Sequence, residues 1–164
     1  MSLQAKKILI SAAATVVVVG GFLVAPAIAT PGSGFVPSSV AAFHYDALDV
    51  KADKDAKWDL FLKTKDDTDI GVDKLTVDPG GQSGWHTHAG PTFVTVKTGE
   101  ITWYDGVLCS WRIYHAGDSF IEAPNHSHMV VNAGADTAEF IAIQIRPKGT
   151  PGRIDAPLPA NCHF

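Results

Sequence analysis

Apolar and polar residues alternate with a period of two in a series of short segments, which is the pattern of half-buried β-strands. The expected strands cover residues 58–63, 70–77, 93–97, 101–104, 111–114, 119–122, 126–131 and 139–145. Turn residues such as Pro79-Gly80-Gly81 and Asp105-Gly106 separate them. No segment after residue 29 has a sustained apolar stripe at helical spacing. The pattern therefore predicts an all-β domain, either an antiparallel sandwich or a barrel.

The segments between and around these strands set the expected boundaries. Thr98-Gly99-Glu100 separates two strands by a short glycine turn, which predicts a β-hairpin. Pro, Gly and Ser dominate residues 30–37, which are expected to form a flexible lead-in. Residues 148–164 are rich in Pro and Gly and are expected to be an irregular C-terminal tail. One β-barrel domain is then expected over residues 38–147.

The first 29 residues have the order of a secretory signal peptide. A short basic start with Lys6 and Lys7 precedes an apolar run, and Ala27-Ile28-Ala29 supplies small residues for a peptidase. Cleavage after Ala29 is expected, and the domain is then exported, as a secreted, periplasmic or cell-surface protein. An uncleaved N-terminal membrane anchor is the alternative, since about 18 apolar residues can span a bilayer.

Charge and cysteine content narrow the function classes. The 164-residue chain has 13 basic and 17 acidic side chains, a formal net charge of −4, and no basic run in the expected domain. A nucleic-acid partner is therefore not expected. Cys109 and Cys162 are the only cysteines, and an oxidising compartment permits a disulfide between them; two buried thiols are the alternative. With two cysteines, a zinc site made of cysteines is not expected.

Two His-x-His pairs offer candidate metal ligands. They are His86-Thr87-His88 and His126-Ser127-His128. Residues i and i+2 of a strand point to the same face, so each pair places two imidazoles side by side. Neutral imidazole is a ligand for Zn, Fe, Ni and Cu. Two neighbouring strands that each offer histidines to the inner face can supply three ligands to one ion.

The surroundings of these pairs resemble the two sequence motifs of the cupin superfamily. Gly80, His86, His88 and Gly99 follow the first motif, G-x5-H-x-H-x(3–4)-E-x6-G. Pro124, His128 and Asn132, after Gly117, follow the second, G-x5-P-x-G-x2-H-x3-N, with shifted spacing before the histidine. The resemblance covers about residues 70–147. It implies a single-domain cupin, a double-stranded β-helix or jelly-roll barrel.

The chain departs from the first motif at its glutamate, which would fall at Thr92. A threonine hydroxyl is a poor substitute for a carboxylate ligand. The resemblance therefore implies a site of three neutral ligands, His86, His88 and His128, which leaves the full charge of a divalent ion in place. His126 and Thr92 are candidates for a further ligand or for a contact to the ligands. The implied cofactor is a divalent transition metal, Fe, Mn, Ni, Cu or Zn.

Aromatic residues on the expected strands have two interpretations. They can fill the interior of a small barrel, or Phe93, Trp103 and Trp111 can line an apolar pocket above the metal.

Two functions follow from the resemblance. The first is a dioxygenase-type, metal-dependent enzyme that acts on a small organic molecule. The second is a non-catalytic module that binds a metal or a small ligand. The fold alone does not choose between them. The expected partner in both cases is a small molecule; a membrane is a partner only if the N-terminal segment is uncleaved, and a homodimer is compatible with either function.

Overall fold

A computed structural model of the protein describes residues 30–52 and 58–163. Within these ranges all regular secondary structure is β. The expected signal peptide therefore lies outside the described residues. The strands are β1 (Ser33–Tyr45), β2 (Asp49–Lys51), β3 (Phe61–Lys63), β4 (Thr68–Gln82), β5 (His86–Thr87), β6 (Thr92–Thr98), β7 (Glu100–Asp105), β8 (Ser110–His115), β9 (Ser119–Glu122), β10 (His128–Val131), β11 (Ala138–Pro147) and β12 (Ile154–Asp155). Among the described residues, no helix is long and apolar enough to cross a membrane.

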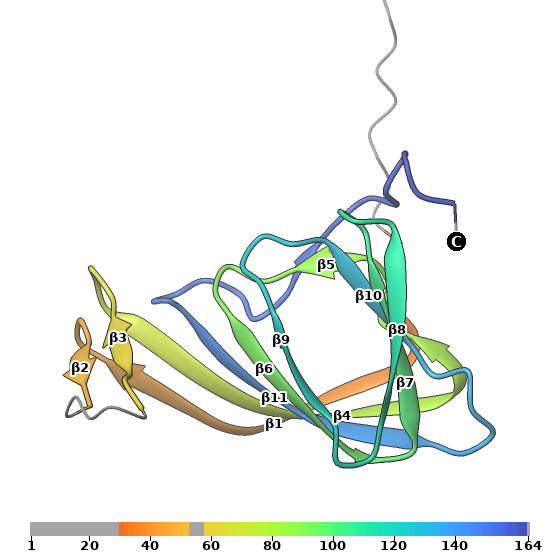
Figure 1. Cartoon of the computed structure of the whole chain (residues 1–164), viewed down its shortest axis with the longest axis horizontal. Helices are drawn as coiled ribbons and strands as arrows, with labels where there is room; N and C mark the ends of the chain where they lie inside the picture. Colours follow the sequence, from red (N-terminus) through yellow and green to blue (C-terminus); the bar gives the residue numbers. More distant parts are fainter. Residues whose placement is uncertain (1–29, 53–57, 164) are drawn as a thin grey trace, which may run out of the picture.

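The strands form a curved sheet that almost closes into a barrel (Figure 1). Its ten strands run in the order β12-β5-β10-β4-β11-β6-β9, with β1 beside β4, and with β7 pairing both β10 and β8. The pairs in this sheet are antiparallel. The all-β prediction and the double-stranded β-helix architecture are confirmed.

Alternation of buried and exposed side chains explains why these segments form strands. Along β6, the side chains of Thr92, Val94 and Val96 are buried, and the intervening ones are exposed. Buried residues of both walls meet in one apolar core, made of Val77, Val94, Val96, Ile101, Tyr114, Val130, Ala138 and Phe140. At one end of this core the buried residues become polar and include three histidines. The barrel therefore encloses a polar site.

The predicted hairpin at Gly99 is wrong. β6 pairs with β9 and β11, whereas β7 pairs with β8 and β10. Gly99, at φ +70°, turns the chain from one wall of the barrel to the other. The hairpin lies one strand later, between β7 and β8, where Asp105 pairs with Ser110. A glycine turn sets the local reversal of the chain, but the tertiary packing of each strand decides its partner.

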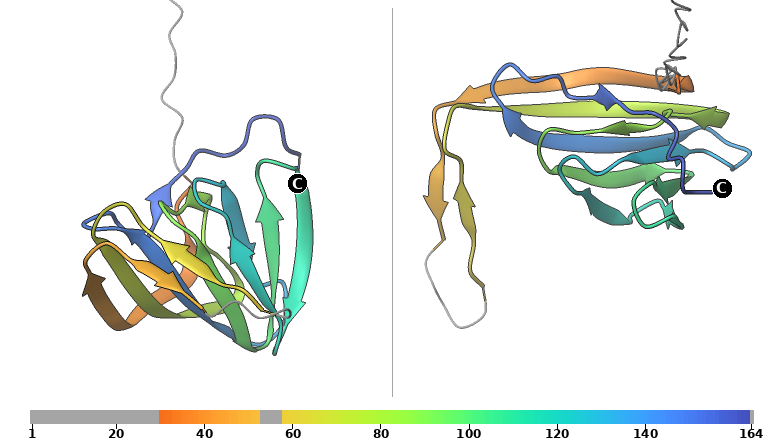
Figure 2. Two further views of the ribbon diagram at one scale, coloured as in Figure 1. Left: turned by 60° about the vertical axis from the view of Figure 1, so that its left-hand side comes forward. Right: turned by 90° about the horizontal axis from the view of Figure 1, so that it is seen from above.

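Both ends of the expected domain are more regular than predicted. Residues 33–37, expected to be a flexible lead-in, form the start of β1 and pair with β4. In the tail, β12 pairs with β5. β2 and β3 form a separate two-stranded sheet, which projects from the ends of β1 and β4 away from the barrel (Figure 2).

The predicted disulfide is present. Cys109, in the turn between β7 and β8, is bonded to Cys162 near the C-terminus, with a Cα–Cα distance of 5.1 Å. It fastens the last residues of the chain to the end of the barrel that holds the histidines.

Candidate metal centre

Three histidines meet inside the barrel. His86 belongs to β5, His88 follows it, and His128 begins β10 directly opposite His86. Their ring centroids lie 4.3 to 5.1 Å apart, and one nitrogen from each ring lies within 4.8 Å of the others. All three side chains are buried, with His128 at 0% exposure. The His-x-His spacing of residues 86–88 thus places both rings in one cluster, as the period of two predicts.

Backbone carbonyls fix the orientation of all three rings. The Nδ1 atom of His86 lies 3.0 Å from the Gly84 oxygen, that of His88 2.5 Å from the Gly152 oxygen, and that of His128 2.8 Å from the His126 oxygen. A carbonyl oxygen can only accept, so each Nδ1 must carry the proton. In the neutral rings, Nε2 then presents its lone pair. Such second hydrogen bonds are typical of histidines that ligate metals.

Glu122 is the residue that the sequence interpretation missed. Its carboxylate oxygens lie 3.1 Å from Nε2 of His88 and 3.1 Å from Nε2 of His128, and its side chain is buried. It belongs to β9, where it pairs directly with Thr92 of β6. A buried carboxylate from the neighbouring strand therefore lies beside the histidines, although position 92 itself is a threonine. The expectation of three neutral groups, His86, His88 and His128, did not include this carboxylate.

The electrostatics of this cluster favour a cation at its centre. Nε2 of His128 is fully buried and makes no hydrogen bond within the described residues, although an oxygen of Glu122 lies beside it. The lone pair of a neutral imidazole repels a carboxylate oxygen at this distance, unless a proton or a metal ion lies between the two atoms. Three imidazole nitrogens and one carboxylate form a donor set suited to a divalent transition metal. The residues present therefore fit the implied cofactor.

The pKa values of two of these groups are strongly shifted. Burial, followed by the nearby charges of His128 and Arg153, lowers the pKa of His86 to about 2, so its ring is neutral at physiological pH. Burial by itself raises the pKa of Glu122, but the electrostatic interaction with His128 and the hydrogen-bonding contacts to His128 and His88 outweigh it. The net pKa of Glu122 lies below its ordinary value, and the carboxylate is ionised at neutral pH. Both groups are thus in the protonation state that a metal ligand requires.

Two cavities adjoin the histidines. The inner one, of about 30 Å³, is lined by His86, His88, Thr92, Glu122 and Gln144 together with apolar side chains. The outer one, of about 220 Å³, shares His86, His88, Gln144, Phe35 and Leu75 with the inner one, and adds Pro37, Asp73, Gly152 and Arg153. The two cavities are therefore neighbours, separated by the side chains that line both.

Thr92 lines the inner cavity. Its side chain is fully buried, and Oγ1 has no hydrogen-bond partner in the described parts of the chain. A buried hydroxyl without a partner is unfavourable by about 1–3 kcal/mol. Its position beside Glu122 makes it a donor available to a molecule that enters the inner cavity.

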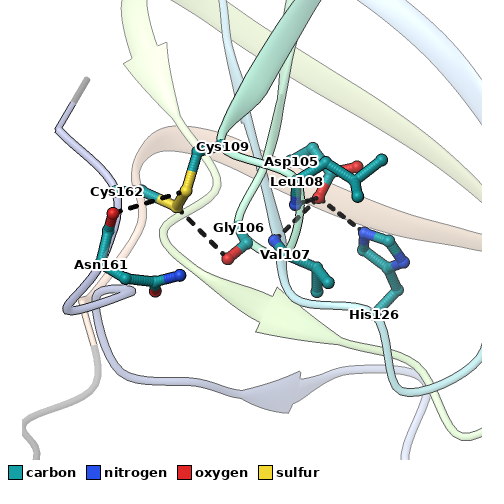
Figure 3. The surroundings of a disulfide bond; sticks show 8 residues. All are labelled: Asp105, Gly106, Val107, Leu108, Cys109, His126, Asn161 and Cys162. Atoms are coloured by element: carbon teal, nitrogen blue, oxygen red, sulfur yellow. Dashed lines mark hydrogen bonds and ion pairs between the residues drawn. A yellow bond between two sulfur atoms is a disulfide. The ribbon is translucent and has the colours of Figure 1, made fainter.

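His126 does not point toward the cluster. The Nε2 atom of His126 lies 2.7 Å from Oδ1 of Asp105 (Figure 3). The backbone oxygen of His126 accepts a hydrogen bond from Nδ1 of His128. His126 therefore contacts the cluster through its backbone carbonyl, while its imidazole contacts Asp105.

The three aromatic residues expected to line a pocket differ in their placement. Trp103 stacks on His128, with ring centroids 5.9 Å apart, and its Nε1 donates a hydrogen bond to Oε1 of Glu122. Phe93 and Trp111 are exposed, at 42% and 62%, and line neither cavity beside the histidines. The pocket interpretation is therefore wrong for these two, because their side chains point outward, and Trp103 also lines neither cavity.

A family model matches the same part of the chain as the two sequence motifs. Residues 74–144 match the sequence model of the family described as "Cupin domain". No curated protein matches the chain.

Several solved structures are similar. A cupin domain from Bordetella pertussis Tohama I is 18% identical over 73% of this chain and 99% of its own, with a TM-score of 0.46. A cupin 2 conserved barrel domain protein from Salinispora arenicola CNS-205 is 25% identical over 48% of this chain and 64% of its own, with a TM-score of 0.43. An oxalate oxidase is 23% identical over 52% of this chain and 45% of its own, with a TM-score of 0.45. The chain thus spans less than two thirds of the last two proteins.

Proposed function

The chain belongs to the cupin superfamily, and on this premise we propose that it holds one divalent transition metal on His86, His88, His128 and Glu122 and is a dioxygenase-type enzyme for a small organic molecule. The observation that carries the proposal is the set of three imidazoles whose Nδ1 atoms are tied to backbone carbonyls while their Nε2 atoms converge beside a buried carboxylate. The donor set is compatible with Fe, Mn, Ni, Cu or Zn.

The carboxylate changes the chemistry that the site supports. One anionic and three neutral ligands reduce the charge of a divalent ion from +2 to +1, so the site retains a net positive charge for an electron-rich ligand. When bound, such a metal supplies Lewis acidity and, for redox-active ions, access to O₂ chemistry. The Trp103 indole donates to Glu122 and fixes the carboxylate, and its ring covers His128.

The substrate side of the site is formed by the two cavities. Phe35 and Leu75 provide apolar walls, and the buried amide of Gln144 lies between the outer and the inner space. The Thr92 hydroxyl can donate a hydrogen bond to an oxygen atom of the molecule that reaches the cluster. About 220 Å³ fits a compact molecule better than an extended one, so the substrate class is a small, oxygen-bearing organic compound.

The alternative is a non-catalytic module that binds a metal or a small ligand. The size of the inner cavity favours it, because about 30 Å³ has room for about one or two water molecules but not for an organic substrate. For catalysis, the side chains between the two cavities must move when the substrate binds.

Metal analysis combined with oxygen uptake tests the proposal. Purified protein is expected to hold one transition metal per chain, and a variant with alanine at His86, His88 and His128 is expected to hold none. His115→Ala is the matched control and should retain the metal, because its imidazole is exposed and contacts Glu100 instead of facing the cluster. Retention of the metal by the triple variant would contradict the assignment. Stoichiometric metal without oxygen uptake, across diketones, flavonols and thiols, would favour the binding module.

We also propose that residues 1–29 direct export and are removed after Ala29. The apolar run followed by Ala27-Ile28-Ala29 and the Cys109–Cys162 disulfide support this, since disulfides persist in oxidising compartments. The mass of the exported protein is expected to place Thr30 at the N-terminus. Intact protein beginning at Met1 in the membrane fraction would instead establish an N-terminal anchor.

A further inference from the structure

Two of the three carbonyls that orient the histidines lie near the two ends of the disulfide. The Gly152 oxygen, which accepts from His88, lies in the C-terminal segment, residues 148–163. The His126 oxygen, which accepts from His128, lies in the turn before β10. The third carbonyl, that of Gly84, is close in sequence to His86, the residue that it orients. The C-terminal segment thus orients the ring of His88, and the turn before β10 orients the ring of His128.

The C-terminal segment is attached to the barrel on both sides of Gly152. Before it, Arg146 Nε donates to the Thr150 oxygen. β12 pairs with β5, with Asp155 opposite His86, and the Ala156 amide donates to the Trp85 oxygen. Cys162 then closes the segment onto Cys109. A short strand of two residues provides little pairing energy by itself, so the covalent bond restricts how far Gly152 can move away from His88.

The other end of the disulfide is held against the turn that precedes His128. Figure 3 shows Asp105 at the centre of this contact: its Oδ1 accepts from the amides of Val107 and Leu108 and lies 2.7 Å from Nε2 of His126. The Gly106 amide donates to the Ser127 oxygen. The turn that contains Cys109 is therefore bonded to the segment that contains the His126 carbonyl.

We infer that the C-terminal segment, fastened by the Cys109–Cys162 disulfide, is a positioning element of the metal site, which holds the Gly152 and His126 carbonyls against Nδ1 of His88 and His128. This inference rests on the proposed function. Contacts of this kind to metal ligands typically change metal affinity by about 10- to 100-fold. A dithiol that reduces the bond, giving two cysteine thiols and its own disulfide, would then weaken metal binding.

The test measures the dissociation constant for Zn²⁺ by chelator competition, and the absorption spectrum of the Co²⁺ form. Oxidised wild-type protein is compared with the C109S/C162S double variant, which is expected to bind Zn²⁺ about 10- to 100-fold more weakly and to show a shifted Co²⁺ spectrum. Val96→Ala is the control for lost stability, because Val96 is fully buried in the apolar core and lines neither cavity. It should leave both readouts unchanged.

The outcomes separate the two proposals. If oxidised wild-type protein binds no metal, the proposed function fails. If the wild type binds metal and C109S/C162S binds it equally well, this inference fails. If the double variant does not fold, Ala156→Pro decides: it keeps the disulfide but removes the amide that donates to Trp85, and it should weaken Zn²⁺ binding by about tenfold. Unchanged binding by Ala156→Pro overturns the inference.

Discussion

Glu122→Gln is expected to weaken binding of a divalent metal by at least about 100-fold, equivalent to about 2.7 kcal/mol. The substitution keeps the size of the side chain and one of its oxygens but removes the buried negative charge that lies 3.1 Å from two imidazoles. A divalent ion would then remain at its full charge among neutral ligands in a buried site, which is unfavourable. The measurement is the Zn²⁺ dissociation constant from chelator competition.

The matched control is Glu100→Gln, which removes the same charge from a half-buried residue that contacts His115, away from the cluster. It should change metal affinity less than twofold. Equal affinities of Glu122→Gln and wild-type protein would contradict the role of Glu122 as a ligand.

The pairing of Thr92 with Glu122 allows a sharper test. Since the two residues are directly opposite on β6 and β9, exchanging them in a T92E/E122T double variant moves the carboxylate across the strand pair. The double variant should bind the metal at least tenfold more tightly than Glu122→Thr alone. No recovery would show that the exact strand position of the carboxylate matters more than its charge.

The histidines could be predicted from the sequence and the carboxylate could not, for a physical reason. Spacing along one strand fixes which side chains share a face, so His86 and His88 could be placed together from the sequence. The position of Glu122 depends on the register between β6 and β9, which no local pattern specifies. The available signal was weak: Glu122 ends an alternating strand, S-F-I-E, on the same face as the half-buried Phe120.

The outward-facing aromatic residues show the same limit. Strand alternation requires Phe93 to face away from Thr92 and Val94, but the sequence does not say which of the two faces is the interior. The prediction of a hairpin at Gly99 was wrong for a similar reason, because strands that are adjacent in the sequence of a jelly roll can belong to different walls of the barrel. Local conformation was thus predictable, and strand pairing was not.

Some glycines are required by the local backbone conformation and others by tertiary packing. Gly80 and Gly99, which match the cupin motifs, have φ values of +73° and +70° and serve as turns. Gly90 matches no motif and has no positive φ, yet a Cβ atom at Gly90 would lie 1.8 Å from the backbone oxygen of Ile145 in β11. The loop after His88 thus packs directly on the backbone of β11, which the sequence alone does not reveal.

Gly90→Ala is therefore expected to lower the free energy of unfolding by about 3 kcal/mol or more, because a strand backbone cannot move aside as a side chain can. Gly80→Ala is the control: its Cβ would meet no atom within 4 Å, so it should cost only the about 1–2 kcal/mol of a left-handed backbone. Urea unfolding of the oxidised protein measures both. The displaced loop should also weaken Zn²⁺ binding in Gly90→Ala, since His88 lies two residues before it. If Gly90→Ala costs no more than Gly80→Ala, the close packing of this loop against β11 is not a constraint on the fold.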